Sequence, residues 1–388
     1  MPDTTWKKSR VALYLIAFLF NLHSAIPTYV TSTFLAQFTG NAMVGIVYTA
    51  ASILALIAFA CILRILRRFG NIIVTLALCL IEFISLLVLA FAPGTLAVIV
   101  FFMTSFASVA LINFTLDALL EDFSTQNKTG DIRGVYYTAD NLGWLLAPII
   151  AALLLGAGED FSRVFFAIAG ILTLTIIIIA GSFQGFKDPE YSKTRFWTAI
   201  AEFLKDRDMR AIYIAEVLIQ FFYAWMIIYM PIYLHQTVGF SWTTIGILFS
   251  VMLIPFVLVG IPEGFYSDRG FGERRFIALG FLIMAAGTVL CALYGDGNIL
   301  VWGILLFTTR IGAASAEVMS DTYFFKKING RDIEKITLFR TARPLAYVIS
   351  SVAATLILIG TDLQGLLVVL GILMLYGIRV AFVLNDVR

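Results

Sequence analysis

Two stripes of charged and polar side chains interrupt long apolar segments of this chain: Asn113, Asp117 and Glu121 form the first, and Arg310, Glu317 and Asp321 form the second. Within each stripe the residues recur at helical spacing, so they lie on one face of a helix. Desolvation favours the neutral form of a carboxyl group, and a nearby guanidinium favours the ionised form. We therefore predict proton binding at Asp117 and Glu317, with Glu121 and Asp321 as further candidates nearer the ends of their helices. A fixed salt bridge is the alternative role for Asp117 and Arg310, and a hydrated position at the helix boundary is the alternative for Glu121 and Asp321.

The segments around these stripes are long and apolar enough to cross a membrane. Charged residues make up 13% of the chain, against roughly 25% in soluble domains. A membrane-spanning helix needs about twenty apolar residues, and such runs predict twelve spans: 11–34, 43–63, 71–91, 95–119, 133–155, 163–183, 210–234, 242–262, 275–294, 298–320, 336–358 and 365–385. We therefore expect an all-α polytopic membrane protein with the lipid bilayer as a partner.

Lysine and arginine are distributed unevenly between the loops. If the N-terminus is cytoplasmic, 22 of the 27 Lys and Arg residues lie on the cytoplasmic side, and only Arg163 lies in a loop on the other side. Basic residues are retained in the cytoplasm during insertion, so we expect cytoplasmic N- and C-termini and a location in the plasma membrane. This bias accounts for the net charge of +2, and we expect no nucleic-acid partner. Neither the three Cys nor the two His have metal-site spacing, so we expect no metal and no cofactor.

The sequence contains an internal repeat. Pro27-Thr-Tyr29 recurs 204 residues later as Pro231-Ile-Tyr233, and Gly70 recurs 202 residues later as Gly272. The acidic pairs of the two stripes are 200 residues apart. Each half contains an even number of predicted spans, so both halves cross the membrane in the same orientation, as in transporters built from parallel repeats. We predict two six-helix bundles, 1–184 and 209–388, joined by a cytoplasmic linker at 185–208.

Over its whole length the chain resembles the major facilitator superfamily of membrane transporters. The most specific similarity is the loop from Gly264 to Arg275, which contains Asp268 and is similar to the family's Gly-x-x-x-Asp-Arg-x-Gly-Arg-Arg loop with one inserted residue. The loop after the second span departs from this pattern, because Arg67 stands where the family usually has aspartate. The resemblance implies that these loops contact the other half of the protein. Two contacts are expected: Asp268 near Arg133 at the start of the fifth span, and Arg67 with Asp332 or Glu334 near the eleventh.

The resemblance also implies that the first, fourth, seventh and tenth spans line a central cavity, in which the two stripes face each other. The cavity residues expected from these spans are Asn21, His23, Thr28, Asn113, Gln220, Tyr223, Trp225, Tyr229 and Arg310. Polar and aromatic walls suit amphipathic or aromatic substrates, and Arg310 can bind charged substrate groups. For His23, the alternative is a histidine held by hydrogen bonds within the helix packing.

Other charged and small residues within the spans bear on the transport cycle. Asp140 in the fifth span lies at the depth of Arg343 in the eleventh, which suits a gate between the two halves. The stretch from Gly143 to Ala152 is similar to the Gly-x-x-x-Gly-Pro-x-x-Gly-Gly element of exporters that exchange substrate for protons, and an ordinary packing face is the alternative. The charges of Glu82 and Arg379, in the third and twelfth spans, fit none of these roles.

The sequence also bears on which energy source drives transport. It has no nucleotide-binding loop of the type Gly-x-x-x-x-Gly-Lys-[Ser/Thr], so we expect secondary transport and no enzymatic activity. We predict a secondary active transporter that works by alternating access, a proton-coupled exporter (antiporter) of small amphipathic or cationic organic molecules. Sodium is the alternative coupling ion.

Two other functional classes fit the same sequence. One is a proton symporter or uniporter for a nutrient such as a sugar, peptide or organic anion, in which Arg310 and Arg343 would bind the substrate. The other is a non-transporting sensor or lipid-handling protein on the same fold, because a fold alone does not define a function. Members of the resembled family commonly act as monomers, and a monomer is expected here.

Overall fold

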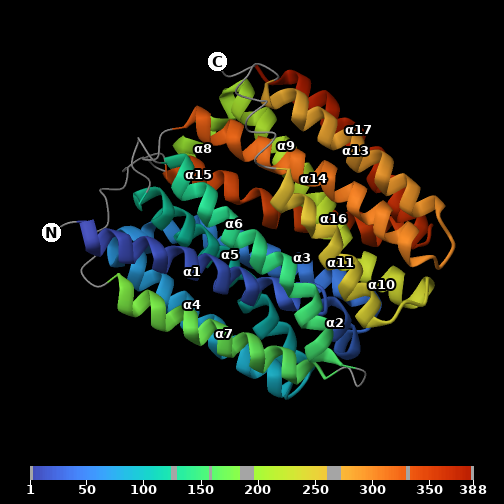
Figure 1. Ribbon diagram of the computed structural model, residues 1–388, viewed down its shortest axis with the longest axis horizontal. Helices are drawn as coiled ribbons and strands as arrows, with labels where there is room; N and C mark the ends of the chain where they lie inside the picture. Colours follow the sequence, from blue (N-terminus) through green and yellow to red (C-terminus); the bar gives the residue numbers. More distant parts are fainter. Residues whose placement is uncertain are drawn as a thin grey trace. The chain divides into compact units, whose positions relative to one another are not determined.

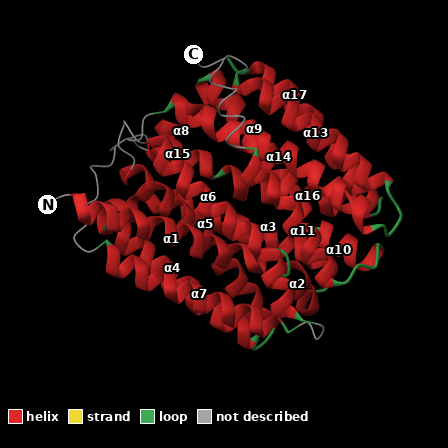
Figure 2. Cartoon of the chain, viewed as in Figure 1, coloured by secondary structure: helices red, strands yellow, loops and turns green. Residues whose placement is uncertain are grey.

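The computed structural model describes residues 3–123, 129–156, 160–183, 196–259, 272–328 and 333–385. These residues form helices joined by short loops, and no strand occurs among them (Figure 2). The all-α class predicted from the sequence is therefore confirmed. The chain divides into two compact units, Met1–Lys193 and Thr194–Arg388. This division falls inside the predicted linker, whose bounds stay a prediction.

The helices of the first unit are α1 Asp3–Thr28, α2 Thr31–Thr39, α3 Asn41–Phe69, α4 Asn71–Phe91, α5 Thr95–Phe123, α6 Thr129–Leu155 and α7 Phe161–Ser182 (Figure 1). Those of the second unit are α8 Phe196–Lys205, α9 Arg207–Ile228, α10 Met230–Ile232, α11 Trp242–Leu258, α13 Glu273–Leu293, α14 Ile299–Lys327, α15 Ile333–Arg340, α16 Ala342–Ile357 and α17 Leu363–Val383. A turn of π-helix, Tyr233–Thr237, follows α10.

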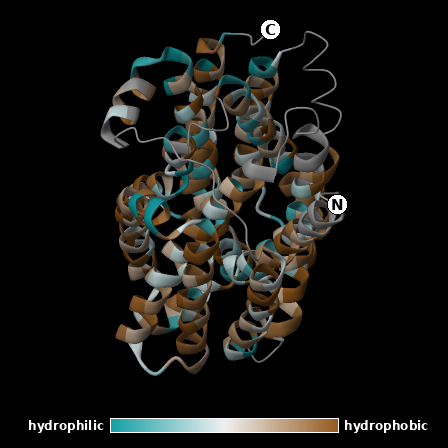
Figure 3. Cartoon of the chain, turned by 90° about the vertical axis from the view of Figure 1, so that its left-hand side faces the viewer, coloured by the Kyte–Doolittle hydropathy of each residue, from teal (hydrophilic) through white to brown (hydrophobic). Residues whose placement is uncertain are grey.

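Within the described residues, ten helical stretches are long and apolar enough to cross a membrane. They coincide with ten of the twelve predicted spans. In the other two places the described helices are shorter, because α11 has 17 residues and the predicted span 336–358 is divided between α15 and α16. The count of twelve spans therefore stays a prediction. Figure 3 shows apolar residues along most of the length of the helices, as expected for helices that cross a bilayer.

Prolines divide helices at matching places in the two units. In the first unit, α1 ends at Thr28, directly after Pro27, and α2 begins at Thr31. In the second unit, α9 ends at Ile228 before Pro231, and the chain continues through α10 and the π-helical turn. A proline inside a helix lacks the N–H for the bond to the fourth preceding carbonyl, and its ring clashes with that carbonyl. Both prolines belong to the internal repeat, so the repeated sequence produces repeated breaks.

Gly70 and Gly272 adopt nearly the same backbone conformation, each directly before a helix. Their φ angles are 83° and 79°, and they precede α4 and α13. A positive φ is strained for residues with a Cβ atom and readily adopted by glycine. The internal repeat therefore extends from the residue types to the backbone.

In the first unit, α1 packs against α6 and α7, and α4 packs against α5 and α7. The backbones of α1 and α6 approach closely at Gly143, where an added Cβ atom would lie 2.8 Å from the Leu22 nitrogen and 2.9 Å from the Phe18 oxygen. Ala147 and Ala151, one and two turns later on the same face of α6, are fully buried. The small residues of this element therefore form a packing face, the alternative considered for them.

In the second unit, α9 packs against α14, α16 and α17, and α13 packs against α14 and α17. α13 and α14 approach closely at Gly280 and Gly312, since an added Cβ atom on Gly280 would lie 2.6 Å from the Gly312 oxygen. The short helix α8 packs on this unit through Phe203, whose ring contacts those of Tyr213 and Phe324. This packing places α9 beside α14, and these two helices carry most of the site described next.

Candidate functional site

Three carboxylates of the second unit lie together on two packed helices: Glu216 on α9, with Glu317 and Asp321 on α14. We call them the carboxylate cluster, because the charges of Glu317 and Asp321 act on Glu216. Gln220 donates a hydrogen bond from its Nε2 to Glu216 Oε1 (2.8 Å). Tyr223 donates one from its hydroxyl to Glu317 Oε2 (2.7 Å). The structure thus brings together four residues predicted for the site: Gln220, Tyr223, Glu317 and Asp321.

Glu216 is the member of this cluster that the sequence analysis missed. It is buried, with 4% of its surface exposed. It lies four residues before Gln220 and seven before Tyr223, so all three side chains share one face of α9. The sequence does contain a signal for Glu216. It is a carboxylate inside the predicted span 210–234, and it lies one turn before Gln220, which was already assigned to the cavity.

Two arginines at the junction of α15 and α16 supply positive charge to the cluster. Arg340 Nη1 lies 3.8 Å from Asp321 Oδ1. Arg340 and Arg343 both interact electrostatically with Glu317. Three acidic side chains and two guanidinium groups therefore share one region of the second unit. Arg343, predicted as a gate residue, belongs to this region.

The position of these arginines follows from a break in the helix. Pro344 lacks the N–H that would bond to the Arg340 carbonyl, and α15 ends at that residue. Thr341 between the two helices donates its hydroxyl to the Leu338 carbonyl (2.6 Å). The hydroxyl groups of Thr341 and Tyr213 are 2.9 Å apart. The break is thereby tied to α9, the helix that carries Glu216.

Arg310 on α14, seven residues before Glu317, lies beneath two aromatic rings of α9. Its guanidinium carbon is 5.4 Å from the ring centroid of Phe222 and 5.4 Å from that of Tyr223. Only 2% of its surface is exposed, and its Nε has no hydrogen-bond partner among the described residues. A guanidinium held against aromatic faces is stabilised by a cation–π interaction. Arg310 therefore lies beside Tyr223, and its role as a cavity residue stays a prediction.

Trp225 and Tyr229, also predicted for the cavity, are placed differently. The indole Nε1 of Trp225 donates to the Ser350 carbonyl of α16 (2.8 Å), and the side chain is fully buried. Tyr229 directly follows α9 and is half-buried. Trp225 thus holds α9 against α16, and a role for either residue in substrate binding stays a prediction.

The polar residues predicted on the first span bond to their own helix. Asn21 donates from Nδ2 to the Ala17 carbonyl (2.9 Å), and Thr28 donates its hydroxyl to the Ser24 carbonyl (2.7 Å). Such bonds satisfy a polar side chain within an apolar span. Substrate contacts of Asn21 and Thr28 stay predictions.

The other predicted residues are scattered over both units. Asn113 and Asp117 are half-buried on α5, Asp140 is half-buried on α6, Arg67 is exposed near the end of α3, and Glu334 is buried on α15. Asp268 and Asp332, together with the side chains of Glu121 and Arg133, lie outside the described residues. The contacts predicted for Arg67 and for Asp140 with Arg343 would join the two units, and they stay predictions.

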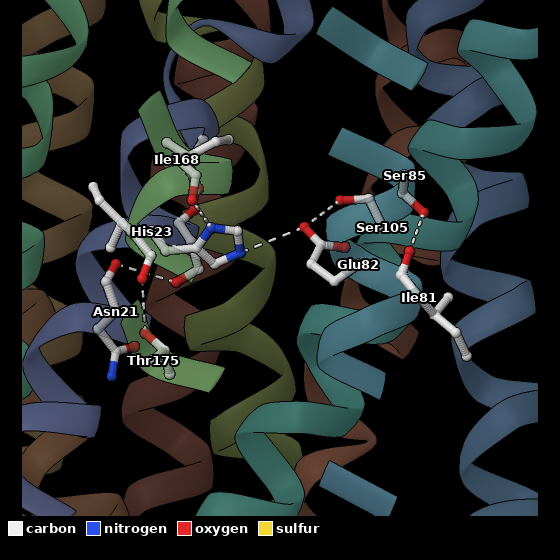
Figure 4. Close-up of polar contacts among 11 residues, drawn as sticks. Asn21, His23, Ile81, Glu82, Ser85, Ser105, Ile168 and Thr175 are labelled. Atoms are coloured by element: carbon white, nitrogen blue, oxygen red, sulfur yellow. Dashed lines mark hydrogen bonds and ion pairs between the residues drawn. The ribbon is translucent and has the colours of Figure 1, made fainter. Parts of the chain in front are cut away.

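His23 has a partner that the sequence analysis did not assign to it, Glu82. His23 Nε2 lies 3.4 Å from Glu82 Oε1, and His23 Nδ1 lies 3.2 Å from the Ile168 oxygen (Figure 4). Ser105 donates its hydroxyl to the same Glu82 oxygen (2.9 Å). His23 and Glu82 are each 1% exposed. The four residues come from α1, α4, α5 and α7, so no local spacing in the sequence indicates the pair.

The chemistry available in the carboxylate cluster is proton binding. Neighbouring carboxylates disfavour one another's ionisation, and nearby guanidinium groups favour it, so small movements of such groups change which carboxylate holds a proton. In the described part of the chain, no group of three or more His, Cys, Asp or Glu side chains is arranged to hold a metal ion.

The long apolar helices, the repeated breaks and the buried charged cluster define a polytopic helical membrane protein of a transporter type. The sequence model of the Major Facilitator Superfamily matches residues 11–331, and the chain belongs to this family. It is therefore a multi-pass membrane protein of a transporter family. No curated protein matches the sequence.

Solved structures show the same fold. A crystal structure of a mutant of the nucleoside transporter NupG is similar to this chain with a TM-score of 0.75. The similarity covers 96% of this chain and 98% of NupG, at 14% sequence identity. At this identity the likeness establishes the fold alone.

Proposed function

We propose that the chain is a proton-coupled secondary transporter that works by alternating access, with the carboxylate cluster as its proton-coupling site. The observation that carries this proposal is the gathering of Glu216, Glu317 and Asp321 on two helices long and apolar enough to cross a membrane, with Arg340 beside them. A charge at mid-membrane costs roughly 2.5–3.5 kcal/mol on insertion scales, and intramembrane carboxylates often serve as proton relays. Asp117 and Glu121 of the first unit are further candidates for the same role.

The hydrogen bonds around the cluster support a particular proton position. Gln220 occupies Glu216 Oε1, whereas Glu216 Oε2 is buried and has no hydrogen-bond partner among the described residues. Burying an oxygen of an ionised carboxylate without a partner is costly. A proton on Glu216 Oε2 removes that cost. Release of this proton then depends on how closely Arg340 and Arg343 approach the cluster. A conformational change that moves substrate and also moves these arginines would link substrate transport to proton transport.

The substrate expected for this site is a small organic molecule with an aromatic ring and polar groups. Arg310, Tyr223 and Gln220 offer a stacked cation, a hydroxyl and an amide within two turns of α9 and α14. Our first candidate is export of amphipathic or cationic molecules in exchange for protons. Because packing against α1 accounts for Gly143, the direction of transport rests on the experiment below.

A second candidate is proton-driven uptake of nucleosides. It is favoured by the likeness of the fold to a nucleoside transporter and by the aromatic and polar groups around Arg310. A nucleoside combines a flat ring, which can stack on Tyr223, with hydroxyl groups that Gln220 and the carboxylates can bind. In either case the positive-inside distribution of Lys and Arg supports cytoplasmic termini, and we propose a monomer in the plasma membrane.

Proton flux in proteoliposomes tests this function. Vesicles containing a pH-sensitive dye are challenged with nucleosides, cationic amphiphiles, sugars and organic anions. A compound-dependent flux is expected for the wild type, and it should be lost in Glu216→Gln and Glu317→Gln. Asp296→Asn, which removes an exposed carboxylate of the same unit, is the matched control and should keep the flux.

The sign of the flux separates the candidates. Proton movement against the direction of substrate indicates exchange, and movement with the substrate indicates symport. If both carboxylate variants keep the full flux, the coupling site is not this cluster. If no compound of the panel moves protons or is itself transported, the proposal of a proton-coupled transporter is wrong and a non-transporting function is favoured.

A further inference from the structure

We infer that His23 and Glu82 form a second proton-binding site, in the first unit, which fastens α1 to α4 while one proton is bound. The site is argued from contacts within the first unit alone. Its part in the transport cycle rests on the proton coupling proposed above. Neither residue belongs to the carboxylate cluster, and the cycle described for that cluster does not use them.

The hydrogen-bond partners determine where the histidine carries its hydrogen. The Ile168 carbonyl, 3.2 Å from Nδ1, can only accept a hydrogen bond, so Nδ1 must be the donor. The Ser105 hydroxyl donates to Glu82 Oε1 at 2.9 Å. His23 Nε2 and Glu82 Oε1 then face each other at 3.4 Å. His23 Nε2 has no hydrogen-bond partner among the described residues. Two bare lone pairs would repel at this position, whereas one proton between them, on either the imidazole or the carboxyl group, would join them.

Because the pair is buried, the shared proton determines whether the contact is favourable. His23 and Glu82 are each 1% exposed, and burying an unpaired ion is strongly unfavourable. With one shared proton the pair is neutral overall, as either an imidazolium with a carboxylate or two neutral groups. Without it, Glu82 is an anion with no cation beside it, and its Oε2 has no hydrogen-bond partner among the described residues. The contact is therefore stable with one proton bound and unstable without it.

Other titratable groups lie farther along the helices that pack around the pair. α4 carries Cys79, three residues before Glu82, and this thiol is fully buried. On α7, Arg163 lies five residues before Ile168 and is paired with Asp160 at 2.8 Å. The remaining described ones on the surrounding helices are Tyr14 on α1, Tyr48, Cys61, Arg64, Arg67 and Arg68 on α3, Asp117 on α5, and Tyr136 and Asp140 on α6.

The pair lies next to the break in α1. Pro27 follows His23 by four residues, so the His23 carbonyl has no N–H of residue 27 to bind. The helix ends one residue later and resumes as α2 at Thr31. Loss of the shared proton would remove the His23–Glu82 contact beside this break, while the packing of α1 against α6 and α7 remains.

Thermal stability of the purified protein in detergent, measured from pH 5 to pH 9, tests the site without substrate or transport. In the unfolded chain a histidine loses its proton near pH 6.5, and a glutamate is then already ionised. The inference requires the folded pair to hold one shared proton that the unfolded chain releases, so the folded state would bind more protons and stability would fall as the pH rises. The melting temperature of the wild type should therefore fall across the measured range.

The variant Glu82→Gln is designed to imitate the protonated pair. With its amide nitrogen in the place of Glu82 Oε1, the variant can donate to both His23 Nε2 and the Ser105 hydroxyl, so it should fold and show a smaller fall in melting temperature across this range. Ser85→Ala removes a hydroxyl that bonds to the Ile81 carbonyl of the same helix (2.8 Å) and leaves the contacts of the pair intact, so it is the matched control. It should keep the same pH dependence as the wild type. Parallel curves for the wild type and Glu82→Gln would overturn the proposal.

Nuclear magnetic resonance of ¹⁵N-labelled histidine provides a test that does not depend on the stability of Glu82→Gln. The chain has only two His residues, and His235→Asn leaves His23 as the only signal. Nδ1 should carry hydrogen, because its partner, the Ile168 carbonyl, can only accept a hydrogen bond, and Nε2 should give the signal of a nitrogen that shares a proton with Glu82. A neutral ring with hydrogen on Nε2 and a bare Nδ1 would contradict the assignment.

The role in transport is tested separately. In proteoliposomes, Glu82→Gln should exchange labelled substrate across the membrane at no less than half the wild-type rate, while accumulation driven by a proton gradient is lost. If accumulation persists, the pair binds a proton without coupling it to transport, and the coupling part of the inference is wrong. If the wild type itself shows no proton coupling, the proposed function fails, while the stability and resonance measurements still decide whether the pair binds a proton.

Discussion

Replacing Gly143 with alanine should force α1 and α6 apart. The added methyl carbon would lie 2.8 Å from the Leu22 nitrogen and 2.9 Å from the Phe18 oxygen, whereas ordinary contacts begin near 3.4 Å. Both neighbours are backbone atoms of a helix, so neither can rotate away as a flexible side chain would. The two helices must therefore separate by a few tenths of an ångström over several turns.

The free-energy change can be worked out from this geometry. Inserting a methyl group into a tightly packed region costs about 1–3 kcal/mol. Alanine is favoured over glycine within a helix by about 1 kcal/mol, which offsets part of that cost. The expected net loss in the free energy of unfolding for Gly143→Ala is therefore about 0–2 kcal/mol, and the two backbone contacts below 3.0 Å favour the upper part of this range.

The matched control is Gly170→Ala on α7. Gly170 is exposed, and an added Cβ atom there meets nothing within 4 Å. This variant should gain up to about 1 kcal/mol from helix propensity alone. The same residue change thus has opposite expected signs at the two positions.

Titration of the detergent-solubilised protein with sodium dodecyl sulfate, followed by circular dichroism, measures both changes. Gly143→Ala should unfold at a lower denaturant fraction than the wild type, and Gly170→Ala at the same or a higher fraction. A Gly143→Ala variant as stable as Gly170→Ala would show that α1 and α6 do not approach as described. The proton flux of Gly143→Ala, per folded molecule, then shows whether this element contributes to transport beyond packing.

Two further predictions concern hydrogen bonds of the second unit. Trp225→Phe removes the buried hydrogen bond from the indole to the Ser350 carbonyl (2.8 Å). In the same titration it should lower the free energy of unfolding by about 1–3 kcal/mol, and the compound-dependent proton flux should be retained. Loss of flux without loss of stability would assign Trp225 to the cavity instead. Tyr223→Phe keeps the ring beside Arg310 but removes the donor to Glu317 (2.7 Å), so the midpoint of the curve of proton flux against pH should shift. An unchanged midpoint would exclude Glu317 as a proton carrier or this hydrogen bond as an influence on it.

Much of the fold could be predicted from residue types and their order. Apolar length identifies the membrane helices, and the repeated Pro27 and Pro231 mark the breaks that end α1 and α9. The break between α15 and α16 was also predictable in principle, because Pro344 lies inside a segment that the hydropathy treats as continuous. Hydropathy averages over about twenty residues, so it does not detect a local loss of one hydrogen bond.

The site was predicted only in part, because sequence spacing describes one helix at a time. Helical spacing groups residues on one helix, and it correctly grouped Gln220 with Tyr223 and Glu317 with Asp321. It does not show which residues of different helices meet, so the partnership of His23 with Glu82 required the tertiary structure. The same spacing argument could have identified Glu216, because it lies four residues before Gln220 on the same face of the helix.

The repeat also shows how the two units have diverged. At the offsets of the repeated prolines and glycines, His23 corresponds to Ile227 and Glu82 corresponds to Met284, while Glu216 corresponds to Ala12. All three counterparts are buried apolar residues. Each copy of the duplicated ancestral unit has therefore acquired, or alone retained, ionisable groups in places where its sister copy has an ordinary hydrocarbon side chain. Duplication relieved each copy of the need to carry every function, and this chain is a case in which the copies have become chemically different while their helix breaks have stayed the same.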